Sequence, residues 1–564
     1  MSVIRVFALG GLGEHGKNMY CVSVSDKIFV LDAGSKYPSI EMLGVDGVIA
    51  DISTLIENKN KIVGLFLSHG HEENIGASVY LLDNLRIPVF GSNFTISVLE
   101  SMLLDDERDL TKYKLFRVND DKVLTFGDCS VTFFATSHSV PQSLGISIIT
   151  PDGSIVYAPD FSLSFTKEPL YQTAFNKLSK IAENDCLAVL PESLGVNNYS
   201  RVTDDYQFNY MISDTLSRKA RVFFMVYSYD LNKIQKVCEL CIKAGRKIAI
   251  IGRKSQRLVN VGLDKNFIKI PKENLVNLRF RDSYNDNNDL NLALIVTGLR
   301  HEPFYMMQRM MNNQDKLVQL VNTDIVINLA PTYPGTERIA TRSIDQMNHI
   351  VRDVITIPKS IMKSSHANSG DLKMLYQILK PKYIIPVIGE YRHQYAQKDI
   401  AIDAGYDSSN IIMLDNGDVA TFEDGEITEE RGKVKTGDIL IDGTLIGNLN
   451  EIVLKDRENL ASEGAVIVSM NIDKTNHKIL SGAYVTSKGF CSENDPRLEE
   501  CNEAISDEAK RVVKNFLKTR TIDWNQLKAS LKDSIGRVIY EYTNMEPIVI
   551  PVIIDVNGDN LWKI

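Results

Sequence analysis

Three histidines and one carboxylate in the first part of the chain have the types and the spacing of metal ligands. His69 and His71 lie one residue apart in LSHGHEENIG, directly after the apolar run IVGLF. His138 follows the alternating run SVTFF, and Asp160 follows the run SIVYA. Imidazole nitrogens and a carboxylate oxygen are ligands that zinc and manganese accept. The pattern predicts a metal site on loops at the ends of strands.

An isolated HxH pair has an ordinary alternative, because histidines also occur at surfaces and in hydrogen-bond networks. The order of the four residues favours the metal site, since each one comes shortly after a β-rich run. Alternate residues of one loop can then converge on a single ion.

A glycine-rich segment near the start resembles a different kind of site. GLGEHG contains Gly11, Gly13 and Gly16 with the spacing of a dinucleotide-binding loop, and Asp32 follows about 20 residues on. Such a loop has to open a helix whose N-terminus holds the pyrophosphate. The residues that follow, NMYCVSVSDKIFVLD, alternate and are β-branched. We therefore predict a hairpin there.

The elements that must position these residues divide the 564-residue chain into four segments. Residues 1–204 alternate short β-rich runs with turn residues, which indicates an α/β sandwich. Residues 205–362 alternate longer helices and strands, as in a doubly wound α/β domain. Residues 363–447 return to the first pattern, which predicts that the second segment is an insertion. Residues 448–564 close the chain with further strands and helices.

The overall charge gives no argument for nucleic-acid binding. The net charge is −9 and the pI is about 5.6, so an RNA site has to be a local basic channel. Two clusters are candidates, although charge clusters are more often solvated surface. The first holds Arg218, Lys219 and Arg221, and the second holds Arg246, Lys247, Arg253, Lys254 and Arg257.

Cysteine usage and hydropathy point to a reducing, aqueous environment. The seven cysteines are scattered, and the one CxxC, Cys238 to Cys241, lies in an amphipathic helical pattern, so we expect it to pack in a core. No stretch is apolar enough to span a membrane, and the first residues lack the features of a signal peptide. We expect a cytoplasmic protein without a membrane partner.

Over nearly its whole length the sequence resembles the ribonuclease J family of metallo-β-lactamase/β-CASP proteins. The shared segments keep the family's order and include ALGGLGEHGKNMY, LDAG, EMLGVD, LSHGHEENIGA, HSVPQSLG, TGLRHEP, LKPKYIIPVIGEYRHQ, LDNGDV and IDGTLIGN. The resemblance implies an α/β architecture: a metallo-β-lactamase αββα sandwich, an inserted β-CASP α/β domain and a small C-terminal α/β domain that supports dimerisation. It also implies 5′-to-3′ exonuclease and endonuclease chemistry in ribosomal RNA maturation and messenger RNA decay.

Members of this family hold two metal ions, and the present sequence keeps only part of the ligand set. The retained positions are His69, His71, His138 and Asp160, most of which belong to the first ion. The resemblance therefore implies zinc or manganese as the cofactor, with one ion bound or none.

Three ligand positions differ from the family. Glu73 replaces an aspartate, Asn74 replaces a histidine, and Ile388 in PVIGE replaces a late histidine. Ile388 has no lone pair, and an amide oxygen is a weak ligand for an ion that favours imidazole and carboxylate. Glu73 is one methylene longer than aspartate, so its carboxylate is displaced by about an ångström, which costs on the order of a hundredfold in rate. We therefore expect Glu73 and Asp160 to be weakened catalytic groups.

The family's RNA-contacting segments are also altered. The segment that holds the terminal phosphate in the family corresponds to Met362, Lys363, Ser364, Ser365 and His366, in which one of two histidines is replaced. A second phosphate-contacting segment corresponds to Asp230, Leu231 and Asn232, where an acidic residue would repel a phosphate. His366 also has an ordinary interpretation as a hydrogen-bonded loop residue.

Three functions remain open on these grounds. The favoured one is a degenerate member of the family that binds RNA and acts with an active ribonuclease J paralogue in a hetero-oligomer, or forms a homodimer when alone. The alternative is a slow 5′-to-3′ exoribonuclease and endoribonuclease that uses a single ion. A small-molecule hydrolase is disfavoured, because it would not need the insert or the long C-terminal region.

Overall fold

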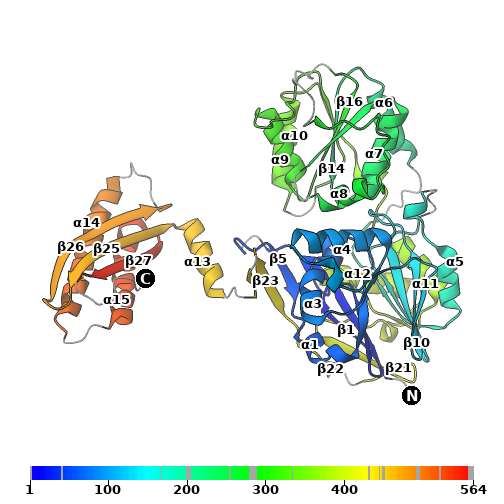
Figure 1. Cartoon of the computed structure of the whole chain (residues 1–564), viewed down its shortest axis with the longest axis horizontal. Coiled ribbons are helices and arrows are strands. Elements are labelled where there is room, and N and C mark those ends of the chain that lie inside the picture. Colours follow the sequence, from blue (N-terminus) through cyan, green and yellow to red (C-terminus); the bar gives the residue numbers. More distant parts are fainter. Residues whose placement is uncertain are drawn as a thin grey trace. The chain divides into compact units, whose positions relative to one another are not determined.

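The computed structural model comprises two compact units (Figure 1). The first unit comprises Met1–Lys36 with Val48–Ile439, and the second comprises Tyr37–Gly47 with Leu440–Ile564. The described residues are 3–39, 42–164, 166, 168–198, 205–252, 256–278, 289–332, 335–429, 432–443, 445–447, 451–490, 496–519 and 523–556.

Two β-sheets form the centre of the first unit. The first sheet has the order β21-β20-β1-β2-β3-β6-β7-β8, with β22 also on β20. The second has the order β19-β13-β12-β11-β10-β9. The strands of the first sheet are β1 (Val3–Gly10), β2 (Met19–Val24), β3 (Lys27–Leu31), β6 (Ile62–Phe66), β7 (Val89–Gly91), β8 (Leu115–Arg117), β20 (Asp418–Glu423), β21 (Glu426–Ile427) and β22 (Gly432–Lys433). Those of the second are β9 (Val123–Phe126), β10 (Cys129–Ala135), β11 (Leu144–Thr150), β12 (Gly153–Ala158), β13 (Cys186–Pro191) and β19 (Tyr383–Ile384).

Helices cover the outer face of each sheet. One apolar cluster joins the inner faces, with residues such as Phe29 from the first sheet and Phe133 from the second. The first sheet is covered by α1 (Ser53–Glu57), α2 (Glu72–Ile75), α3 (Ser78–Leu85) and α4 (Asn93–Asp105). The second is covered by α5 (Phe175–Ala182), α11 (Ser369–Leu379) and α12 (Tyr391–Asp403). The αββα sandwich expected from the sequence is thereby confirmed.

The residues around the glycine-rich segment form a hairpin. β1 pairs antiparallel with β2, and β2 pairs antiparallel with β3, so GLGEHG connects strands and opens no helix. This confirms the hairpin prediction and removes the reason to expect a dinucleotide there. The short strands β4 (Ser35–Lys36) and β5 (Gly47–Ala50) follow and pair antiparallel.

A separate parallel sheet lies between β13 and β19 in the chain. Its order is β15-β16-β14-β17-β18, and alternate residues of each strand face opposite layers of helices. The strands are β14 (Val222–Tyr227), β15 (Lys247–Ile251), β16 (Leu292–Gly298), β17 (Ile325–Asn328) and β18 (Asp353–Thr356). The helices α6 (Tyr206–Leu216), α7 (Leu231–Lys243) and α8 (Arg257–Asp264) pack on one face, and α9 (Glu302–Met311) and α10 (Glu337–Asn348) on the other.

This inserted domain is the doubly wound domain expected from the sequence. Both cysteines of the CxxC pack in the apolar core beneath α7, as predicted. A buried ion pair also fixes the domain, because Arg221 binds both carboxylate oxygens of Asp324 at 2.7 and 2.8 Å.

The second unit has its own small sheet and core. β25 (Ala465–Asp473) lies between β26 (Lys478–Lys488) and β27 (Ile548–Asp555), and α14 (Pro496–Leu517) and α15 (Trp524–Thr543) pack on one face. The other elements are β23 (Asp438–Asp442), β24 (Leu445–Ile446) and α13 (Glu451–Ser462). Across both units, none of the helices that the structure describes is long and apolar enough to cross a bilayer.

Candidate metal centre

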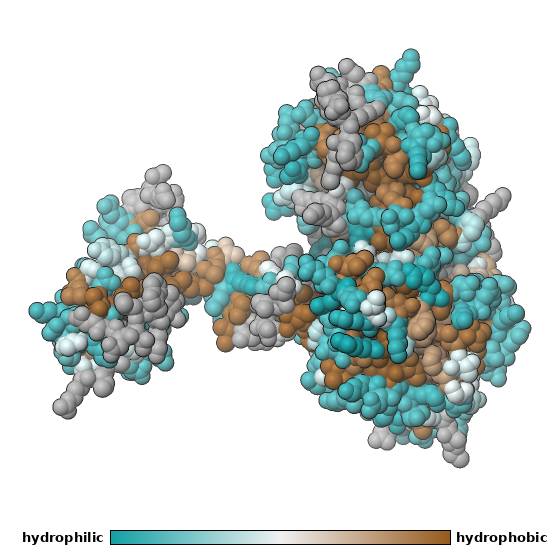
Figure 2. Space-filling view, viewed as in Figure 1, coloured by the Kyte–Doolittle hydropathy of each residue, from teal (hydrophilic) through white to brown (hydrophobic). Residues whose placement is uncertain are grey.

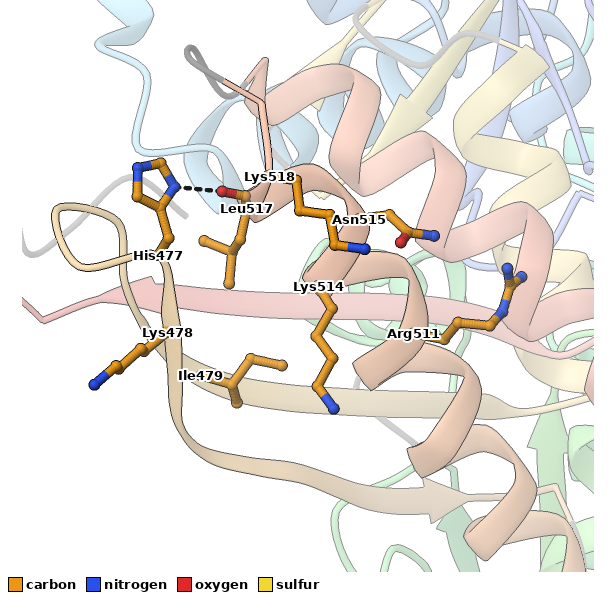
Figure 3. Close-up of a pocket in the computed structure, with 8 residues that line it drawn as sticks. All are labelled: His477, Lys478, Ile479, Arg511, Lys514, Asn515, Leu517 and Lys518. Atoms are coloured by element: carbon orange, nitrogen blue, oxygen red, sulfur yellow. Dashed lines mark hydrogen bonds between the residues drawn. The ribbon is translucent and has the colours of Figure 1, made fainter.

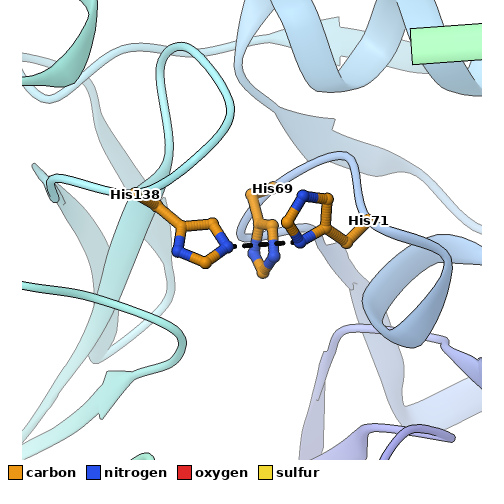
Figure 4. A group of neighbouring side chains, drawn as sticks. All are labelled: His69, His71 and His138. Carbon is orange, nitrogen blue, oxygen red and sulfur yellow. Dashed lines mark hydrogen bonds between the residues drawn. The ribbon is translucent and has the colours of Figure 1, made fainter. Parts of the chain in front are cut away.

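The three predicted histidine ligands converge on one point (Figure 4). The ring centroids of His69, His71 and His138 are separated by 4.7, 4.7 and 4.8 Å. Nε2 of His138 lies 3.2 Å from Nδ1 of His71. The spacing HxH therefore brings two rings of one loop to a third ring from the other sheet.

The strands explain this convergence. β6 of the first sheet ends at Phe66 and is followed by the loop that carries His69 and His71. β10 of the second sheet ends at Ala135, three residues before His138. The ends of strands from the two sheets thus meet at one edge of the sandwich, where irregular loops can present side chains.

Each imidazole is held by a contact to one ring nitrogen. Nδ1 of His69 lies 2.9 Å from Oγ of Ser68, and Ser68 in turn donates to Asp32 at 2.7 Å. Nδ1 of His138 donates to the carbonyl of Ser365 at 2.8 Å, and Nε2 of His71 to the carbonyl of Tyr229 at 3.1 Å. Such outer contacts orient metal-binding histidines, leaving the second nitrogen of each ring for the centre.

The donor set fits a single ion. Nε2 of His69 is buried and has no hydrogen-bond partner among the described residues, which is unusual for a buried polar atom. Oδ2 of Asp160 lies 3.6 Å from it. Burial lowers the pKa of His69 to about 3, with a further lowering from His71, so the ring is in the neutral form that binds metal. His69, His71, His138 and Asp160 together could hold zinc or manganese.

The amide of Asn74, where the family has a histidine, is engaged in hydrogen bonds. Its Nδ2 donates to Asp32 at 2.7 Å, and its Oδ1 accepts from Asn18 at 3.3 Å. Asp32 also accepts hydrogen bonds from Ser68 and Tyr157. Asn74 is therefore part of the buried network that supports the HxH loop.

The two other altered positions differ, because Ile388 has no ligand atom whereas Glu73 has a carboxylate. Ile388 is fully buried in the apolar cluster between the two sheets. Its φ is +54°, a conformation that a β-branched residue rarely adopts and that histidine and asparagine adopt more readily. The backbone at Ile388 thus has a form that suits other residue types better than isoleucine. Glu73 is half-buried, and its backbone carbonyl accepts a hydrogen bond from Asn18.

A second cluster lies beside the histidines and includes a residue that the sequence analysis missed. Nδ1 of His366 is 2.8 Å from Glu192 and 3.3 Å from Asp160. Burial lowers the pKa of His366, but the Glu192 and Asp160 carboxylates outweigh it and hold the pKa well above its usual value. Glu192 is itself buried and accepts from the backbone N–H groups of Phe161 and Ala367.

A signal for Glu192 was present in the sequence. It directly follows the buried strand β13, as Asp160 closely follows its parallel neighbour β12. Polar residues after adjacent parallel strands meet at one edge of a sheet. This places both carboxylates near the histidine cluster.

The segment predicted to contact a terminal phosphate lies partly beside this cluster. Oγ of Ser364 accepts from the backbone N–H of His366, and the Ser365 carbonyl accepts from His138. The side chain of Lys363 reaches Asp205 at 3.2 Å, whereas Met362 is buried in the core.

The second predicted phosphate segment begins α7. Asp230 caps this helix by accepting from the N–H of Lys233, and it also pairs with the Lys233 side chain. Leu231 is buried, and the N–H of Asn232 donates to the Ser139 carbonyl at 2.9 Å. The negative charge of Asp230 is therefore already balanced by an adjacent lysine.

Much of the two basic clusters makes internal contacts. Arg218 pairs with Asp214 and Asp353, Arg221 with Asp324, and Arg257 with Glu72 and Asp105. Arg246 donates to backbone carbonyls, as does Lys247. Arg253 and Lys254 lie outside the described residues.

Known proteins match the chain along most of its length. Three protein families match: the ribonuclease J beta-CASP domain at residues 219–347, the RNA specificity domain of Zn-dependent metallo-hydrolases at 360–411, and the ribonuclease J C-terminal domain at 452–556. A solved structure of a protein of unknown function from Enterococcus faecalis covers 74% of this chain and all of its own, with 14% identity and a TM-score of 0.50, which shows the fold alone.

Two curated relatives extend over the entire length. Ribonuclease J2 of Bacillus subtilis is 34% identical over 98% of this chain and 99% of its own. Ribonuclease J 2 of Staphylococcus aureus is 33% identical over 98% of each chain. Identity at this level over almost the full length of both chains means that the chain belongs to the ribonuclease J family.

Proposed function

We propose that this protein is an RNA-processing subunit of the ribonuclease J type with weak or no nuclease activity of its own. The observation that carries this proposal is the state of Asn74 and Ile388. The amide of Asn74 is bound on both sides by protein groups, and Ile388 is part of the core. Ile388 has no lone pair, and the amide oxygen of Asn74, which accepts a hydrogen bond from Asn18, is a weak metal ligand. Hydrolysis with two ions depends on a clamp that stabilises both the attacking and the leaving oxygen.

The remaining residues would bind RNA without efficient cleavage. His69, His71, His138 and Asp160 would hold one zinc or manganese ion, which when bound supplies Lewis-acid polarisation of a phosphoryl oxygen. We expect contacts to a terminal phosphate at His366 and Lys363, which in the structure pair with carboxylates, His366 with Glu192 and Asp160, and Lys363 with Asp205. Glu73 and Asp160 would be the weakened catalytic carboxylates. Ribosomal RNA maturation and messenger RNA decay are the processes in which we expect the protein to act.

The test combines elemental analysis of the purified chain with degradation of 5′-monophosphorylated RNA in added Mn²⁺ or Zn²⁺. We expect at most one ion per chain and degradation far below that of a family member with all ligands. Degradation at a rate comparable to that member would refute the proposal.

A second candidate function is a slow exoribonuclease and endoribonuclease with one ion. It is supported by the buried Nε2 of His69, which has no hydrogen-bond partner among the described residues and could bind an ion. In this case slow degradation accompanies about one ion per chain, and His71→Ala abolishes it. Degradation that survives His71→Ala would not belong to this site.

We further propose that the protein acts in a hetero-oligomer with an active ribonuclease J paralogue, and as a homodimer alone. The face of the β25–β27 sheet that points away from α14 and α15 exposes Ile467, Tyr484, Ile550, Val552 and Ile554. Figure 2 shows hydrophobic residues at the surface of this unit, among hydrophilic ones. Exposed apolar patches commonly mark protein interfaces.

Val552→Asp with Tyr484→Asp tests this interface by light scattering at several concentrations. We expect these changes to shift the protein toward monomer and to weaken binding of the active paralogue. Leu104→Asp, at an exposed apolar residue of α4, is the matched control. Unchanged mass in the double variant would place the interface elsewhere.

A further inference from the structure

A cationic groove lies in the second unit, where β26 begins beside the end of α14 (Figure 3). It has a volume of about 650 Å³, which is within the size range of ligand sites. The lining residues are His477, Lys478, Ile479, Arg511, Lys514, Asn515, Leu517 and Lys518.

Three of the four cations in this groove lack a carboxylate partner among the described residues. Lys478, Lys514 and Lys518 are exposed and form no salt bridge there, whereas Arg511 pairs with Glu508 at 2.6 Å. Residues 509–519 include no acidic residue, although the chain as a whole carries a net charge of −9. The groove is thus a local concentration of unbalanced positive charge in an acidic protein.

Stabilisation of the helix end explains only part of this charge. Cations in the last turn of a helix interact favourably with its dipole, which accounts for Lys514 and for Lys518 just beyond the end. Lys478 comes from a strand, and Figure 3 shows it and Lys514 on the two sides of Ile479. Nδ1 of His477 contacts the Leu517 carbonyl, which ties the two elements together. The grouping is therefore a feature of the tertiary structure.

The composition of the lining selects the type of ligand. It contains no aromatic residue other than His477 and only two aliphatic ones, Ile479 and Leu517, of which Leu517 is buried. Peptide interfaces depend on aromatic and apolar anchors, and base recognition in single strands depends on stacking platforms. Flexible lysines without such anchors suit phosphate groups.

We propose that this groove is a second RNA-contact surface, which binds backbone phosphates of a single strand without reading its sequence. The inference rests on the proposed function, because it takes RNA as the ligand of this protein. Contacts to phosphates position a nucleic acid and add affinity but carry no sequence information. The groove would therefore retain RNA on a protein that cleaves it poorly or not at all.

The test measures binding of a labelled single-stranded RNA to the full chain by fluorescence anisotropy over a range of KCl concentrations. The groove variant is Lys478→Gln with Lys514→Gln and Lys518→Gln. The matched control is Lys474→Gln with Lys532→Gln and Arg537→Gln, which removes three exposed charges of the same unit outside the lining. Circular dichroism and the melting temperature establish that both variants are folded.

Three lost phosphate contacts reduce the slope of log K against log[salt] by about 2, and affinity at ~0.1 M salt by on the order of a hundredfold. We expect this loss in the groove variant, for RNAs of unrelated sequence alike, and at most a small part of it in the control. An equal loss in both variants, or none in the groove variant, overturns the inference while the proposed function stands.

Two other outcomes concern the ligand. If the unaltered chain binds no RNA at all, both the groove inference and the proposed function are wrong. If the groove variant keeps RNA binding but loses an active ribonuclease J paralogue, the groove is a protein surface and the inference is wrong.

Discussion

The two halves of the candidate metal centre differ in whether their side chains keep an atom that faces the centre. One half consists of the three histidines, and the other of the altered positions Asn74 and Ile388. In the half formed by His69, His71 and His138, an outer contact holds one ring nitrogen and the other nitrogen faces the centre. In the other half, both polar atoms of Asn74 are bound by protein groups, and Ile388 packs in the core. The side chains of the second half therefore contribute to hydrogen bonding and packing within the fold, and their polar atoms have partners.

The difference teaches that ligands can be replaced at little cost to the fold when the new side chains satisfy the old surroundings. A buried carboxylate such as Asp32 needs donors, and Asn74 provides one. An apolar cluster favours a side chain such as Ile388, whose burial offsets a strained backbone. The first half has no such substitute, since the Nε2 of His69 has no hydrogen-bond partner in the part of the chain that the structure describes.

The largest effect is expected from removing a ligand of the histidine half. His69→Ala should reduce bound zinc from about one ion per chain to near zero, because it deletes the imidazole that faces the centre. Elemental analysis after dialysis against a known free zinc concentration measures it. Ile388→Val is the control on the other half, because it leaves the hydrogen bonds of Asp32 intact, and it should leave the zinc content near that of the unaltered chain. Equal losses would mean that the two halves do not differ as described.

The next effect is a gain from rebuilding the second half. Glu73→Asp, Asn74→His and Ile388→His together should raise the ion content toward two per chain. They should also increase RNA degradation on the order of a hundredfold or more, the scale set by an ångström of misplacement. An imidazole at position 74 can still donate to Asp32, and the backbone at Ile388 suits histidine.

Metal titration and degradation of 5′-monophosphorylated RNA measure this gain. The same triple change combined with His69→Ala is the control and should remain inactive. A triple variant that folds and still binds a single ion would show that other features block the second position.

Ile388→Ala addresses the structural role of the second half. It should lower the free energy of unfolding by about 2–5 kcal/mol, because it leaves a cavity in the core. The zinc content of the folded protein should not change. Denaturant unfolding of the zinc-loaded chain, with metal analysis alongside, measures both. A loss of zinc without a loss of stability would show that Ile388 supports the metal site and not the core.

The smallest effect is expected from the outer contact of His69. Ser68→Ala removes the hydroxyl between Nδ1 of His69 and Asp32. The zinc dissociation constant should rise by about 10- to 100-fold, because the ring loses its orientation. Competition with a chelating dye measures the change, and Ser139→Ala, whose hydroxyl contacts His71, gives a second reading of the same effect. No change in either variant would show that packing alone orients the rings.

Sequence by itself determined the family, the fold class and the set of candidate ligands. The spacing in LSHGHEENIG, the strands before His138 and Asp160, and the alternating residues after GLGEHG are local patterns. Local patterns set secondary structure and the ends of strands, and strand ends in an α/β fold carry functional groups. The segment bounds 1–204, 205–362, 363–447 and 448–564, and the ligand roles, stay predictions.

Only the tertiary structure decided how the remaining side chains are used. Glu192 meets His366 across 174 residues of sequence, and Asn74 meets Asp32 across 42. Lys478 joins Lys514 and Lys518 where a strand passes the end of a helix. The physical reason is that hydrogen bonds and charge balance depend on distances in space. Hydrophobic periodicity and short motifs describe neighbouring residues, and they do not specify the distance between residues far apart in the chain.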